Sequence, residues 1–128
     1  MLNLIISNTA DVPIYQQIVN QIRDAILRGE LVEGALLPSI RTLARDLRIS
    51  VITTKRAYDD LENENYIVSV SGKGSYVAER NPELLHESRL GIVERRLEDA
   101  VLTAKSLDIK RTDVYRLLEL IYEEEDDI

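Results

Sequence analysis

The chain has 128 residues, which is enough for one medium domain, or for a small domain with an appendage, and for a hydrophobic core. It contains no cysteine, so disulfides and thiolate metal sites are excluded and a reducing compartment is the expected setting. The formal net charge is −7, and no stretch has the basic start of a signal peptide or the roughly 18 apolar residues of a membrane helix, so we expect a soluble, cytoplasmic protein.

The first predicted elements are a short apolar run and a helix. Residues 2–6 have the length of a strand. Pro13 is suited to be the first residue of a helix, where its missing N–H costs nothing. Gly29 is suited to end this helix in a left-handed conformation, and residues 30–37 form a connector. The apolar residues at helical spacing between them are Ile14, Ile18, Ile22, Ala25 and Ile26.

The central stretch, residues 36–64, predicts two short helices joined by a tight turn. Ser39 is the expected N-cap of the first helix, with Pro38 just outside it. Its apolar residues recur at i, i+3, i+4 and i+7, which is the pattern of one buried helix face. These residues are Ile40, Leu43, Ala44 and Leu47.

The second helix of this pair has the same apolar spacing. Residues 48–49 interrupt the first run, and Ser50 offers a second N-cap. The residues predicted to face inward are Thr54, Ala57, Tyr58 and Leu61. This phase leaves small polar and basic side chains on the exposed first turns, a surface suited to the major groove of DNA. Those side chains belong to Ser50, Thr53, Lys55 and Arg56.

A hairpin follows the two helices. Asn65 is suited to a left-handed helix terminus. Residues 66–70 and 75–78 are β-branched and aromatic runs around the turn Ser71-Gly72-Lys73-Gly74. A helix, a helix–turn–helix and then a hairpin is the order of a winged-helix domain, so the expected fold is mainly α with a small β-hairpin. We assign this winged helix–turn–helix domain to residues 1–80.

Residues 81–128 predict a C-terminal segment of two helices. Asn81-Pro82 marks the boundary, residues 107–109 separate the helices, and the second helix ends in a run of acids to which no task is assigned. Two such helices cannot bury both apolar stripes alone, so they pack on the winged helix or on a second copy; antiparallel pairing across a homodimer is the simpler outcome. The residues assigned to dimerisation are Leu90, Val93, Leu97, Val101, Leu117 and Ile121.

The charge is distributed unevenly along the chain. Residues 1–80 hold 9 Lys and Arg against 10 Asp and Glu, a net of −1, whereas residues 81–128 hold 7 against 13, a net of −6. From Ser39 to Arg56 there are five basic residues and one acid. Phosphate binding depends on the local field within about 10 Å, so the acidic total does not exclude a nucleic-acid partner.

The sequence offers no candidate enzyme or cofactor site. It has no nucleophile–base pair, no glycine-rich phosphate loop before a helix and no paired carboxylates in an apolar setting. His86 is the only histidine and, without cysteine, cannot build a nitrogen or sulfur metal site, so we expect it at the surface or an interface. We expect no enzyme activity, no cofactor and no metal.

Several strings resemble a known family. PIYQQI, LPSIRTLARDL, RAY and GKGSYV, in this order and spacing, resemble the DNA-binding domain of GntR-family bacterial transcription regulators. The resemblance is close over residues 12–78 and rests on length and helix number over residues 82–125. The short C-terminal part resembles the YtrA-type subfamily, which lacks the large effector domain of its relatives. The resemblance implies a homodimeric regulator, most often a repressor, on a two-fold-symmetric operator.

The resemblance also implies roles for particular residues. It implies that Arg41, after LPS, contacts the phosphate backbone or bases, and that the wing tip lies at Gly72 and Lys73. Val51 stands where the family often has arginine, so base reading there is either apolar, such as contact of Val51 or Ile52 with a thymine methyl, or absent. The residues assigned to DNA are Ser39, Arg41, Arg45, Ser50, Val51, Thr53, Lys55, Arg56, Gly72 and Lys73.

Alternatives stay open at this stage. Arg45, Arg48 and Arg56 either touch phosphate or only balance nearby acids, and the wing tip is either a phosphate contact or simply a tight turn. The chain as a whole could instead be a protein-interaction module whose acidic C-terminal helices dock a basic partner. A third reading is a sensor for a small-molecule effector, although residues 81–128 show no pocket in sequence.

Overall fold

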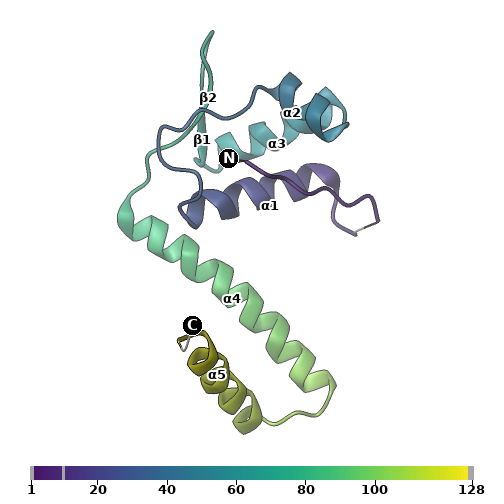
Figure 1. Ribbon diagram of the computed structural model, residues 1–128, viewed down its shortest axis with the longest axis vertical. Coiled ribbons are helices and arrows are strands. Elements are labelled where there is room, and N and C mark those ends of the chain that lie inside the picture. Colours follow the sequence, from purple (N-terminus) through teal and green to yellow (C-terminus); the bar gives the residue numbers. More distant parts are fainter. Residues whose placement is uncertain (1, 10, 127–128) are drawn as a thin grey trace. The chain divides into compact units, whose positions relative to one another are not determined.

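The computed structural model describes residues 2–9 and 11–126, which divide into two compact units, one ending at His86 and the other beginning at Glu87 (Figure 1). The first unit contains the helices α1 (Ile14–Leu27), α2 (Ile40–Leu47) and α3 (Val51–Asn63) and the strands β1 (Ile67–Val70) and β2 (Gly74–Val77). Helix α4 (Pro82–Ser106) begins in the first unit and continues into the second, which also holds α5 (Arg111–Asp126). The predicted fold class, mainly helical with a small winged hairpin, is confirmed.

The core of the first unit forms where α3 packs against both α1 and α2. Ile18 and Ile22 of α1 and Leu61 of α3 are completely buried. Thr54 is also completely buried, as its position on the inward face predicted, and its hydroxyl donates to the carbonyl oxygen of Ser50 (3.1 Å). This bond satisfies a hydroxyl that the inward phase of α3 takes out of water.

The predicted helix limits hold, with one shift. Ser39 and Ser50 are the N-caps of α2 and α3. Arg48, the C-cap of α2, is left-handed with φ 58°. Asn65 is left-handed as well, with φ 64°. Pro13 is the N-cap of α1 rather than its first helical residue; its carbonyl still accepts the N–H of Gln17 (3.0 Å), so the displacement is a single residue.

The hairpin is antiparallel, with Ile67 opposite Val77 and Val70 opposite Gly74. Its tip projects away from the three helices (Figure 1). Gly72 has φ 76°, a conformation that side chains with a Cβ rarely adopt, so the tip requires glycine there. The connector before α2 borders β2, because the N–H of Leu37 donates to the carbonyl of Ser75 (2.9 Å). This bond fixes the wing beside the start of α2.

The N-terminal run is not a strand, because none of its described residues pairs with another strand. Two glutamine side chains of α1 take the place of a partner strand. Gln21 accepts from the N–H of Ile5 and donates to its carbonyl (2.9 and 2.7 Å), and Gln17 does the same for Ser7 (2.9 and 2.9 Å). The two bonded residues, Ile5 and Ser7, lie two positions apart, and their bonds to the glutamines hold this run along α1.

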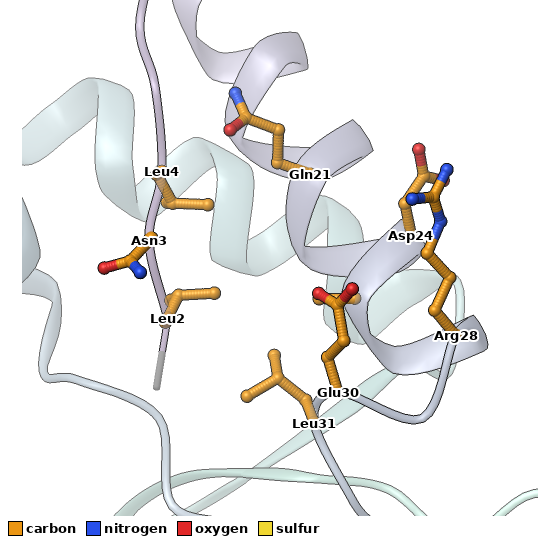
Figure 2. A pocket seen from close by; sticks show the side chains of 9 residues that line it. Leu2, Asn3, Leu4, Gln21, Asp24, Arg28, Glu30 and Leu31 are labelled. Atoms are coloured by element: carbon orange, nitrogen blue, oxygen red, sulfur yellow. The ribbon is translucent and has the colours of Figure 1, made fainter. Parts of the chain in front are cut away.

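A shallow pocket of about 310 Å³ lies where this N-terminal run meets the end of α1 (Figure 2). Leu2 and Leu4 form one wall, and Gln21 lies across from them on α1. Charged side chains of Asp24 and Arg28 line the far end. The pocket is open to solvent and is lined by both apolar and charged side chains.

The second unit buries none of its described residues. Asp108, left-handed with φ 55°, separates α4 from α5 as the interruption at residues 107–109 predicted. The apolar stripe stays in solvent; Leu97, for example, is 46% exposed. An open hollow of about 560 Å³, not predicted from the sequence, lies at the junction of the two helices and is lined by residues that include Val101 and Ile109. Residues 127–128 of the acidic tail lie outside the described residues.

No helix in residues 2–9 and 11–126 combines the length and the apolar character needed to cross a bilayer.

Candidate nucleic-acid interface

The first turn of α3 presents two exposed aliphatic side chains and a hydroxyl. Val51 is 47% exposed and Ile52 is 82% exposed. Ser50 is occupied as the cap: its Oγ accepts the N–H of Thr53 (3.0 Å), and its hydroxyl is 2.7 Å from the Thr53 Oγ1, to which it donates. Because Thr53 Oγ1 accepts this bond from Ser50, the bond does not use the hydroxyl proton of Thr53.

Both basic residues of α3 are engaged within the protein. The Lys55 ammonium lies 2.8 Å from the Asp59 carboxylate, one turn further along the helix. The Arg56 guanidinium lies 3.7 Å from the centre of the Tyr15 ring at the start of α1. An exposed pair such as Lys55–Asp59 contributes only about 0.3–0.5 kcal/mol, so DNA could displace it. The stack on Tyr15 connects α3 to α1, and it means that the Arg56 guanidinium already has a partner within the protein.

The start of α2 repeats the arrangement seen at α3. Ser39 Oγ accepts the N–H of Thr42 (3.1 Å), and its hydroxyl donates to the Thr42 Oγ1 (2.8 Å). Arg41 is exposed on the first turn and makes no ion pair with any described residue. Arg45, one turn on, is exposed and lies 3.5 Å from Asp46, a loose surface pair. Arg41 is therefore the free cation of α2.

The wing tip carries a second free cation. Gly72 and Lys73 are both exposed, and no ion pair joins Lys73 to the described part of the chain. The Lys73 backbone is fixed on both sides, because its N–H donates to the Val70 carbonyl (2.9 Å) and its carbonyl accepts from the Tyr76 hydroxyl (3.2 Å). A fixed backbone with a free ammonium is suited to a phosphate contact.

Two contacts position α2 and the wing relative to α3. The Tyr58 hydroxyl donates to the carbonyl oxygen of Pro38 (2.6 Å), just before α2. Burial raises the pKa of the Tyr58 hydroxyl, so it remains a donor at neutral pH. The Glu62 carboxylate accepts from the N–H and the hydroxyl of Ser69 in β1 (3.3 Å each). The segment before α2 and the wing are thus both hydrogen-bonded to α3, the second helix of the helix–turn–helix and hence its recognition helix.

Comparison with known proteins identifies this arrangement. Residues 14–77 match the family described as "Bacterial regulatory proteins, gntR family". The chain is 33% identical over 92 residues to the HTH-type transcriptional repressor YtrA of Bacillus subtilis, across 72% of this chain and 71% of that protein. The chain belongs to the GntR family. The YtrA-type resemblance is confirmed as well, because the match to that repressor extends over most of both chains.

Solved structures agree with the assignment. A GntR-family transcriptional regulator from Listeria monocytogenes has a TM-score of 0.74 at 29% identity, covering 85% of this chain and 95% of that one. The DNA-binding domain of AraR in complex with operator ORX1 has a TM-score of 0.54 at 25% identity, covering 60% of this chain and 96% of that one. This GntR-family protein is a DNA-binding transcription regulator, and its relatives are regulators rather than enzymes.

Sequence reasoning missed several residues that build this GntR-family surface. Thr42 completes the cap of α2, and its signal was the repeated spacing of Ser39 with Thr42 and Ser50 with Thr53. Tyr15 stacks on Arg56, and Glu62 holds the wing; neither contact has a signal in the sequence, since the partners are brought together only by packing. His86 is exposed, and the described residues contain no group of three acidic or histidine side chains able to hold a metal ion.

Proposed function

We propose that this protein is a repressor that binds a two-fold-symmetric operator as a homodimer. In this proposal residues 1–80 form the DNA-binding domain, with the start of α3 in the major groove, α2 across the backbone and the wing on a neighbouring phosphate. Residues 81–128 form the dimerisation segment.

The observation that carries the proposed DNA-binding surface is the presence of free cations on the two elements that flank α3, one on α2 and one at the wing tip. Arg41 and Lys73 are exposed and make no ion pair within the described residues, while the first turn of α3 presents neutral side chains. Cations on phosphates supply affinity that falls with salt, and contacts to base edges supply sequence choice. The arrangement divides these two tasks between the flanking elements and the helix.

The dimer is supported by the exposed apolar stripe of the second unit. The side chains at Leu90, Val93, Leu97 and Val101 of α4 are all exposed, as are those at Leu117 and Ile121 of α5. A helix pair that buries nothing gains little from packing, and isolated helices are marginal in water. A second copy would cover the stripe with the same residues, in a closed two-fold interface. Two recognition helices related in this way fit half-sites about one helical turn, roughly 34 Å, apart or a multiple of it.

The test is a fluorescence-anisotropy titration with the promoter fragment upstream of the protein's own gene and a scrambled duplex of the same length, at two salt concentrations. Tight, salt-sensitive binding to the promoter alone is the expected result. Light scattering of the complex should give two chains per duplex. Equal, weak binding to both duplexes would contradict specific recognition of this promoter.

The acidic end of α5 keeps one other candidate open. Glu123, Glu124 and Glu125 are exposed and adjacent, a surface that fits a basic protein partner. Absence of binding to either duplex, even at low salt, would favour this protein-interaction function over the repressor. The hollow at the junction of α4 and α5 is a candidate location for an effector of the repressor.

A further inference from the structure

We infer that α3 recognises thymine through its 5-methyl group, with Ile52 as the specificity-determining residue and Val51 beside it. The protein then selects an A·T pair at the corresponding position of each half-site. This inference rests on the proposed function, because it assumes that the start of α3 enters the major groove.

The first observation is the placement of Ile52. Its side chain is 82% exposed, although it is one of the largest aliphatic groups in the unit. Each residue of an α-helix advances about 100°, so Ile52 lies roughly 160° from completely buried Thr54 and points almost directly away from the core. On the first turn of the recognition helix, this direction is the one that faces the base edges.

The second observation is that the first turn of α3 carries no cation, because the two basic residues of the helix, Lys55 and Arg56, lie beyond it. The commonest specific contact in the major groove is an arginine or lysine on the O6 and N7 of guanine. In this helix Lys55 is paired with Asp59 at 2.8 Å, and Arg56 is stacked on Tyr15 at 3.7 Å. A guanine at the base contacted by Ile52 would present its O6 and N7 acceptors to an aliphatic side chain that cannot donate, which is unfavourable once water is excluded.

Thymine is the base that matches this surface. Its C5-methyl group is the apolar feature that the major groove presents, beside the O4 acceptor. Ile52 and Val51 would cover the methyl group, and the hydroxyl proton of Thr53, which the bond from Ser50 does not use, would donate to an acceptor on the same or the next base. One helical turn thus supplies both an apolar contact and a hydrogen bond.

The experiment starts with selection of operators by the full-length protein from a random duplex DNA library. Each thymine of the selected sequence is then replaced by deoxyuridine, which removes only the methyl group and keeps base pairing. At one thymine per half-site, this replacement should weaken binding by about four-fold, the factor that corresponds to burial of one methyl-sized group. The other thymines should tolerate the replacement.

Two variants assign the effect to the residue. Ile52→Ala should bind the thymine and the deoxyuridine duplexes equally, since it lacks the group that covers the methyl. Val32→Ala is the matched control, because Val32 is a similarly exposed aliphatic residue (63%) on the connector and outside α3; it should keep the full four-fold difference. Both positions are exposed, so neither change disturbs the core.

The outcomes are distinct. Tight binding of the wild-type protein to a selected operator in which no deoxyuridine replacement matters would overturn methyl recognition while leaving the repressor function intact. A four-fold effect that persists in Ile52→Ala would assign the contact to another residue and overturn the role of Ile52. If no sequence is enriched and no duplex is bound, the proposed function fails, and the inference falls with it.

Discussion

Two cations of the proposed DNA-binding surface, Lys73 and Arg56, should respond differently to removal. Lys73 is free at the wing tip, whereas the Arg56 guanidinium lies 3.7 Å from the centre of the Tyr15 ring. The changes to compare are Lys73→Gln and Arg56→Gln, each of which removes one positive charge per chain. The reasoning predicts a change in the salt dependence of operator binding for the first variant alone.

The expected size follows from the number of phosphates released. A homodimer loses two phosphate contacts with Lys73→Gln, and each contact changes the slope of log K against log salt by about 0.9, so the slope should become shallower by about 1.8. Between 50 and 200 mM salt, a difference of about 1.8 in slope means that the wild-type protein loses about twelve-fold more affinity than the variant.

Arg56→Gln should leave the slope unchanged and lower the affinity by a constant factor. A cation stacked on an aromatic ring near the surface stabilises by about 0.5–1 kcal/mol, so poorer alignment of α3 should cost about two- to five-fold at every salt concentration. Tyr15→Leu should reproduce this loss, and Tyr15→Phe, which keeps an aromatic ring, should not. The assay is fluorescence anisotropy with one operator duplex over the same salt range.

A shallower slope for Arg56→Gln, equal to that for Lys73→Gln, would refute this reasoning. It would mean that the guanidinium leaves the Tyr15 ring and reaches a phosphate in the complex.

Three further changes test the scaffold and the assembly. Tyr58→Phe should lower the free energy of unfolding by about 1 kcal/mol, because it removes the hydrogen bond to the Pro38 carbonyl; urea denaturation measures this. Leu97→Asp should give monomers by light scattering and weaken operator binding, because it places a charge in the proposed dimer stripe. Ser50→Ala should lower the free energy of unfolding by about 1 kcal/mol through loss of the cap on the Thr53 N–H.

Each change has a matched control on the same chain. Tyr122→Phe, at an exposed position on α5, should leave the urea midpoint unchanged. Glu98→Gln, at an exposed position next to Leu97, should remain dimeric. A Leu97→Asp protein that stays dimeric would contradict dimerisation through the apolar stripe. Ser71→Ala, an exposed serine outside the helices, should not change stability; an equal loss there would show that the effect at Ser50 is not capping.

Local chemistry determined the framework of this protein. The two capping serines, the left-handed Asn65 and the glycine-rich hairpin turn each act within a few residues of themselves, so the sequence predicted the ends of α2, α3 and the wing. The sequence also predicted which side of α3 faces the core, because the period of an α-helix determines which residues share a face. The family resemblance added the order of the elements and the residues to test.

The tertiary structure decided which polar groups are free to meet DNA. Arg56 and Tyr15 are separated by 41 positions, and only the packing of α3 on α1 brings them together. The same is true of Tyr58 with Pro38, and of Gln21 with the backbone of Ile5, which replaced an expected strand pairing. Long polar side chains take whichever partner the fold places within reach. The sequence could therefore name the basic and hydroxyl residues of the surface, but only the packed structure distinguished free cations such as Arg41 and Lys73 from Lys55 and Arg56, which contact other side chains of the protein.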